Sequence, residues 1–98
     1  MNATVVFTDD FRADLRARTR RLLADDRRDW AGRLMEEVEL LALLLGASPR
    51  AGAVELRREG REIRRVVLRR LPFVVWYHFR SREKKVVVLR LFHVRQRR

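Results

Sequence analysis

The sequence predicts an α+β fold of the order β-α-α-β-β-β, in which a helical hairpin packs on one face of a small, mainly antiparallel sheet. Apolar residues recur at helical spacing from about residue 9 to residue 46. After the loop "GASPRAG" (46–52) they come instead in extended β-branched and aromatic runs. Helices and a sheet that each have one apolar face are stable when these faces cover one another. The length of 98 residues suits one domain, 1–98.

The first strand and the first helix follow from the start of the chain. "ATVVFT" (Ala3–Thr8) is rich in β-branched and aromatic residues, as strands are. Thr8 is placed to cap a helix, because Asp9 and Asp10 then put negative charge on its first turn. Apolar residues repeat at helical spacing up to Leu22, so this helix is expected to reach about residue 24.

A second helix is expected after the charged stretch "DDRRD" (25–29), where Asp26 or Asp29 could act as the cap. This helix is expected to end at Gly46. Its apolar residues form one stripe, made of Trp30, Leu34, Val38, Leu41 and Leu45.

Three strands are expected in the second half of the chain. Ile63–Arg70 is rich in β-branched residues, and Phe73–Arg80, "FVVWYHFR", is the most strand-like run of the sequence. The turn Ser81–Lys84 has the length that joins a hairpin, so Val86–Val94 is expected to pair back.

Alternation along the last two strands separates their faces. In one strand Trp76, His78 and Arg80 lie opposite Phe73, Val75, Tyr77 and Phe79, and in the other Val88, Arg90 and Phe92 lie opposite Leu89, Leu91, His93 and Arg95. The sequence leaves open which set faces the helices. With helices on one side only, a basic and aromatic surface stays open to a partner in either case.

The charge of the chain is concentrated at one end. Residues 1–60 carry as many acids as arginines, so the net charge of +11 belongs to residues 61–98. This asymmetry predicts an acidic partner for the C-terminal part. Nucleic acid, an acidic protein and an anionic membrane all have the required charge.

Other features limit where the protein is located and which chemistry it can perform. The longest apolar run, "LLALLLGA" (40–47), is far shorter than the roughly 20 residues that span a bilayer. There is no cysteine, which excludes a thiolate metal site. We expect a cytoplasmic protein without metal or cofactor and without a membrane partner.

The end of the chain carries a resemblance. "SPRAG" (48–52) after the second helix and "LRRLPFVVWYHFRSREKKVVVLRLFHVRQRR" (68–98), taken with the element order, resemble the RelE/ParE toxins of bacterial type II toxin–antitoxin systems. The resemblance implies a toxin that a cognate antitoxin neutralises in a hetero-oligomeric complex. RelE-like members cleave mRNA on the ribosome, whereas ParE-like members bind DNA gyrase and block it.

The RelE-like alternative requires a nuclease site. The residues that such an enzyme would use here are Arg61, His93 and Arg95, placed around the scissile phosphate. Two departures weaken the match: Val74 stands where these nucleases often have an arginine, and no aromatic residue follows Phe92. We therefore favour a non-enzymatic, ParE-like gyrase inhibitor that arrests growth, with the ribosome-dependent mRNA endonuclease as the alternative. A nucleic-acid binder ranks third, because no base-reading module is evident.

The residues predicted to bind the antitoxin or the target are basic residues of the C-terminal part, with the basic end as the docking place of an acidic antitoxin segment. They are Arg58, Arg61, Arg65, His78, Arg80, Arg90, Arg95, Arg97 and Arg98. Purely structural roles compete with this interpretation: His93 can close a sheet corner, His78 can be a solvated or edge side chain, and Trp76 and Tyr77 can serve packing.

Overall fold

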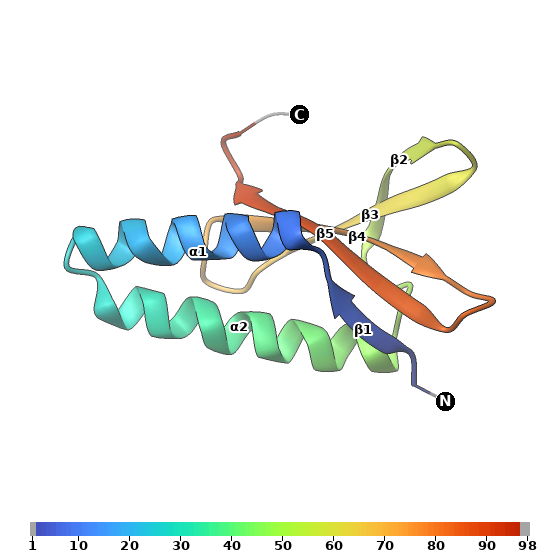
Figure 1. Ribbon diagram of the computed structural model, residues 1–98, viewed down its shortest axis with the longest axis horizontal. Helices are drawn as coiled ribbons and strands as arrows, with labels where there is room; N and C mark the ends of the chain where they lie inside the picture. The colour runs from blue at the N-terminus through green and yellow to red at the C-terminus, as the bar shows by residue number, and fades with distance from the viewer. Residues whose placement is uncertain (1, 97–98) are drawn as a thin grey trace.

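The structure, a computed structural model, describes residues 2–96 as two helices and five strands (Figure 1). The elements in chain order are β1 (Thr4–Phe7), α1 (Asp9–Ala24), α2 (Arg28–Ala47), β2 (Ala53–Arg58), β3 (Arg61–Val67), β4 (Phe73–Arg80) and β5 (Lys85–His93). The strands form one sheet in the order β1-β5-β4-β3-β2, in which β1 is parallel to β5 and the other neighbours are antiparallel. The predicted α+β fold is confirmed, and β2 is a strand that the prediction does not contain.

The two helices lie side by side and cover one face of the sheet (Figure 1). α1 begins after Thr8 as predicted, because the Thr8 Oγ1 accepts a hydrogen bond from the Phe11 N–H at 3.0 Å. The same hydroxyl donates to the Leu89 carbonyl at 2.9 Å, which ties the start of α1 to β5. Within residues 2–96, no helix is long and apolar enough to cross a membrane.

The link between the helices differs from the prediction. α2 begins after Arg27 without a side-chain cap, so neither Asp26 nor Asp29 caps it. Asp26 has a left-handed φ of 56° and ends α1 instead. The Asp26 N–H donates to the Leu23 carbonyl and the Arg27 N–H donates to the Leu22 carbonyl, the pattern of a Schellman turn. Aspartate tolerates the left-handed conformation better than most residues, so the tight break needs no glycine.

The core lies between the helices and the inner face of the sheet. The predicted stripe of α2 is buried from Leu34 to Leu45, and Trp30 packs against it partly exposed. The most completely covered side chains are Phe11, Leu34, Leu45, Val75, Tyr77, Val86 and Val88. Covering an apolar side chain of this size contributes about 1.5–3 kcal/mol, so the contact between helices and sheet holds both layers in place.

β2 lacks the alternation by which strands are predicted. Half of its six residues are charged and nearly all are exposed. Pairing with β3 holds it in place, through a two-residue turn in which Glu59 and Gly60 both have positive φ, 53° and 77°. An ion pair between the Arg65 Nε and the Glu55 Oε1, at 2.8 Å, crosses the same hairpin.

The remaining strands agree closely with the prediction. β4 has the predicted bounds Phe73–Arg80, the turn Ser81–Lys84 follows it, and β5 is shifted by one residue from the predicted Val86–Val94. β3 begins and ends earlier than the predicted Ile63–Arg70. After Val67 the chain leaves the sheet, and Arg70 adopts a left-handed φ of 62° in the turn before β4.

β4 shows which face meets the helices. Phe73, Val75 and Tyr77 belong to the core, and Trp76, His78 and Arg80 belong to the opposite face. In β5 the predicted grouping of Val88 with Arg90 and Phe92 is wrong. Consecutive residues of β4 pair with Val88 and Arg90, so Leu89 is extra and forms a bulge. Val88 and Leu91 are therefore both buried in the core, while Phe92 lies on the outer face.

Tyr77 joins the loop after α2 to the centre of the sheet. Its hydroxyl accepts a buried hydrogen bond from the Gly52 N–H at 2.8 Å. Burial raises the pKa of this tyrosine, so the hydroxyl stays neutral at physiological pH. A Cβ at Gly52 would lie 2.7 Å from the Arg65 carbonyl oxygen and 2.9 Å from the Tyr77 hydroxyl, so only glycine fits.

We expect Tyr77→Phe to lower the free energy of unfolding by about 1–3 kcal/mol, because the buried Gly52 N–H then has no acceptor. Urea denaturation followed by circular dichroism measures the change. Gly52→Ala provides a second probe, and it should destabilise through the close backbone contact. Unchanged stability of Tyr77→Phe would show that the hydrogen bond does not hold the loop.

Candidate partner-binding surfaces

The outer face of the sheet, opposite the helices, contains a hollow of about 420 Å³. It is lined by Val67, Val74, Trp76, Phe92 and Val94, with Glu55, Arg65 and Gln96 beside them. The rings of Trp76 and Phe92 meet edge to face with centroids 5.1 Å apart. We call this surface the outer hollow. Its arginine is ion-paired to its carboxylate, so these two charges balance each other beside the apolar side chains.

Arg90, a predicted binding residue, is bound within the fold. The Asp14 carboxylate of α1 accepts two hydrogen bonds from its guanidinium, at 2.7 and 3.0 Å, and a third from the Leu91 N–H at 2.9 Å. The hydrogen bonds that Arg90 donates to Asp14 raise the pKa of its guanidinium above the ordinary value. Asp14 thus accepts a backbone N–H of β5 beyond the end of the short strand β1. The main role of Arg90 is to join β5 to α1 within the fold.

His93 and Arg95 form the corner where β5 ends. The His93 Nδ1 accepts a hydrogen bond from the Arg95 N–H at 3.1 Å, and the Gln96 Oε1 accepts one from the His93 N–H at 2.9 Å. The Arg18 guanidinium also donates to the Gln96 Oε1. The His93 ring stands edge-on to Phe73, with centroids 5.8 Å apart. These contacts give His93 a structural role in closing the corner.

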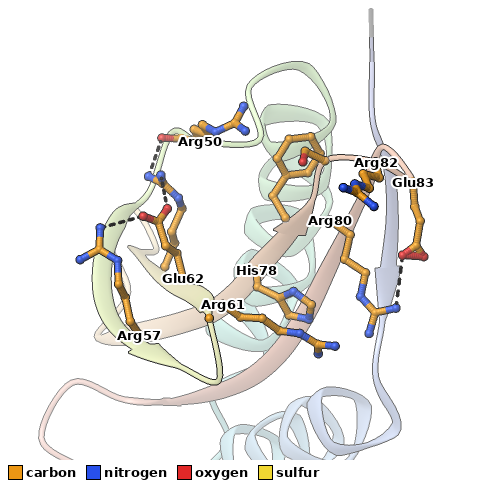
Figure 2. A pocket seen from close by; sticks show the side chains of 12 residues that line it. Arg50, Arg57, Arg61, Glu62, His78, Arg80, Arg82 and Glu83 are labelled. Carbon is orange, nitrogen blue, oxygen red and sulfur yellow. Dashed lines mark hydrogen bonds and ion pairs between the residues drawn. The ribbon is translucent and has the colours of Figure 1, made fainter.

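The hairpins β2–β3 and β4–β5 diverge at their tips (Figure 1). A basic cleft lies between them, lined by the side chains in Figure 2. The ladder between β3 and β4 ends at the pair Arg64–Tyr77, and beyond it each strand pairs only with the other strand of its own hairpin. The cleft has a volume of about 550 Å³. We call it the fork. Its charged residues are Arg50, Arg57, Arg61, Glu62, Arg64, Arg80, Arg82 and Glu83, with His78 among them.

His78 lies in the fork between Arg61 and Arg80 (Figure 2). Only 4% of its surface is exposed, so the interpretation of this histidine as a solvated side chain is wrong. Burial is the main cause that lowers its pKa, and the charges of Arg80 and Arg61 lower it further. The imidazole is therefore neutral at physiological pH.

The structure distributes the predicted binding residues over several places. Arg61, His78 and Arg80 come together in the fork, Arg65 lies at the outer hollow, and Arg95 lies at the corner with His93. Arg58 ends β2 opposite Arg61. Arg97 and Arg98 lie outside the described residues.

Sequence reasoning missed several members of the fork. Arg50, Arg57, Arg64 and Arg82 come from a loop, two strands and a turn, and only the divergence of the hairpins brings them together. A signal existed in the dipeptide Glu59–Gly60, because a two-residue turn there places β2 against β3. Among residues 2–96, no group of three or more acidic, histidine or cysteine side chains is placed to hold a metal ion.

We expect the stability of the protein to fall as the pH drops from about 7.5 to about 5.5. Because the pKa of His78 is lower in the folded state than its ordinary 6.5, the unfolded chain binds more protons in this range. The contribution of the neutral His78 to the free energy of unfolding is complete above pH 6.5. It is lost as the pH falls toward the pKa of His78 in the folded state. Melting temperatures across this range should fall less for His78→Gln. A pKa of His78 at or above 6.5 in an NMR titration would contradict this expectation.

Comparisons with known proteins agree with this fold. Residues 5–98 match the family model described as "ParE toxin of type II toxin-antitoxin system, parDE". The structure is similar to the chromosomal ParDE toxin–antitoxin system from P. aeruginosa, with a TM-score of 0.73 and 20% identity over 93% of this chain and 95% of that one. It is also similar to the RelBE2 toxin–antitoxin complex from Mycobacterium tuberculosis, with a TM-score of 0.60 and 30% identity over 95% of this chain and 99% of that one. No curated protein sequence gave a significant match.

The family model covers nearly the whole chain, from β1 to the C-terminal residue. The match to the ParDE structure, at its low identity, supports the shared fold alone. The resemblance inferred from "SPRAG" and the closing strands is therefore confirmed: the chain belongs to the ParE toxin family of type II toxin–antitoxin systems.

Proposed function

We propose that this toxin inhibits DNA gyrase by protein–protein contact through the outer hollow and breaks no bond itself. Gyrase is the target that the resemblance to ParE-like toxins implies. The observation that carries the proposal is the composition of the hollow, in which five apolar side chains gather beside one ion pair. Binding energy at protein interfaces is concentrated in such apolar, aromatic centres with a polar rim.

The placement of the nuclease candidates supports the same proposal. Arg61 lines the fork together with Arg80, whereas His93 pairs with Phe73 at the other end of β4. Seven residue steps along a strand span about 20 Å, so Arg61 and His93 do not face one phosphate. His93 is also engaged, since its Nδ1 accepts the Arg95 N–H. RNA cleavage requires a proton acceptor, a proton donor and cations around the same phosphorus.

The proposal includes a cognate antitoxin that masks the toxin in a hetero-oligomeric complex in the cytoplasm. Both similar structures come from toxin–antitoxin systems. The net charge of +11 in residues 61–98 favours an acidic antitoxin segment on this part of the chain. Arg80 and Arg95 are two of the basic residues in this part of the chain.

A paired assay tests the target. Purified toxin, freed of antitoxin, is added to gyrase with relaxed plasmid and ATP, and in parallel to programmed ribosomes with end-labelled mRNA. We expect loss of supercoiling with intact mRNA. Cleaved mRNA with normal supercoiling would instead establish the endonuclease alternative and overturn the proposal.

A pair of double variants tests the surface. Val67→Glu with Val94→Glu puts two charges into the outer hollow at exposed positions, and we expect at least about tenfold weaker gyrase inhibition. Leu40→Glu with Leu43→Glu is the matched control, because both leucines are exposed on α2. The control should inhibit as the unmodified toxin does. Loss of inhibition in the control alone would place the contact on the helices.

A further inference from the structure

We propose that a cavity beside the link between the two helices binds a small planar aromatic molecule that carries one carboxylate or phosphate group. The cavity is on the helix side of the sheet, so the proposal goes beyond gyrase inhibition through the outer hollow and can fail independently of it. Three properties carry it: a space of the size of one aromatic ring, an apolar lining, and three guanidinium groups without carboxylate partners. We call this cavity the hairpin pocket.

The hairpin pocket lies where the end of α1 and the start of α2 meet the turn before β4 and the end of β5. Its volume is about 180 Å³. An engineered protein cavity of about 150 Å³ holds benzene. The hairpin pocket therefore has room for one six-membered ring with a small substituent.

The apolar part of the lining is formed by Leu22, Trp30, Pro72 and Phe73. Phe73 is buried in the core, and Leu22 and Trp30 pack against the same core partly exposed. A flat ring that contacts these side chains removes apolar surface from water on both sides. Aromatic rings also attract one another in edge-to-face and offset arrangements. The lining thus favours an aromatic ring over a hydrated ion.

Two of the three guanidinium groups are held in place by aromatic rings. The Arg18 guanidinium lies over Phe73, 5.6 Å from the ring centre, and the Arg27 guanidinium lies over Trp30 at 5.5 Å. A guanidinium that lies over a ring keeps its N–H donors at its edge, where an anion can accept them. One donor of Arg18 is used by the Gln96 Oε1, which leaves others.

The third guanidinium belongs to Arg21, which follows Arg18 by one helical turn on α1 and also lines the pocket. Among residues 2–96, no carboxylate lies within ion-pairing distance of Arg18, Arg21 or Arg27. Asp26 stands in the link between the helices, yet its contact is with Arg28, at 4.0 Å. Three like charges therefore surround an apolar space without a counter-charge.

The ligand class follows from the two properties together. An inorganic anion would satisfy the arginines but leave the apolar lining in contact with water. An uncharged ring would cover the lining but leave the guanidinium groups without an acceptor. A ring with one anionic group satisfies both, and carboxylates and phosphates each match the fork of a guanidinium.

The probes that test the proposal are benzoate and phenyl phosphate, each added to the isotope-labelled full chain freed of antitoxin. The chain has two tryptophans, Trp30 at the hairpin pocket and Trp76 at the outer hollow, so their indole N–H signals in NMR spectra report on the two sites separately. We expect at least one probe to shift the Trp30 signal saturably, with a dissociation constant of about 1 mM or lower. The Trp76 signal should not move.

Three further compounds separate the parts of the ligand. Acetate and inorganic phosphate carry the charge without the ring, and benzyl alcohol carries the ring without the charge. Each should bind at least about tenfold more weakly than the better probe. The better of the two probes identifies the anionic group as a carboxylate or a phosphate.

A pair of double variants tests the cations. We expect Arg21→Gln with Arg27→Gln to weaken binding at least about tenfold, because two of the three donors are lost. Arg16→Gln with Arg33→Gln removes the same charge at exposed helix positions outside the pocket, and should weaken binding less than about threefold. Leu22→Phe keeps all charges but fills the space with a ring of its own, and it should also abolish binding.

Several results would overturn the proposal. They are the absence of a saturable shift of Trp30 with either probe, a shift of Trp76 in its place, and equal losses in the two double variants. Binding of acetate, inorganic phosphate or benzyl alcohol as tight as that of the better probe would also overturn it, because the ring and the charge would then not act together. Undiminished binding to Leu22→Phe would place the ligand outside the pocket.

Discussion

Both candidate surfaces depend on the position of Tyr77. Its side chain is fully buried, its hydroxyl accepts the Gly52 N–H, and the ladder between β3 and β4 ends at this residue. A slip of β4 by one residue would bring Trp76 or His78 into the core and expose Tyr77. Because the hydrogen bond opposes that slip, it keeps the apolar residues of β4 in the outer hollow and the polar ones in the fork.

The fold was largely predictable because most elements carry strong local signals. β4 combines β-branched and aromatic residues between a proline and a polar turn, so its bounds were found residue by residue. β2 has no such signal: its side chains are charged and exposed, and only the turn at Gly60 and the pairing with β3 make it a strand. The bulge at Leu89 was equally hidden, since it depends on the pairing of β5 with β4 rather than on the sequence of β5.

The site was predictable in its residue types but not in its grouping. The excess of arginine after residue 60 identified the basic part of the chain. Arg90 belongs to that part, yet it is held by Asp14 of α1, a contact between residues 76 positions apart. Arg50 lies before that part, yet it reaches the fork, where its guanidinium rests 5.0 Å from the centre of the Phe79 ring. Such groupings follow from tertiary packing, which spacing along the chain does not encode.

The parallel pairing of β1 with β5 has a consequence for how the toxin is made. Thr4 pairs with Lys85, and Val86 and Val88 of the same last strand are buried in the core. A nascent chain that stops before β5 therefore has β1 without its neighbour and a core without part of its sheet. Contacts between distant parts of a chain form late, because the loop between them must first close. A chain that is truncated before β5 thus lacks the packed sheet on which both binding surfaces lie.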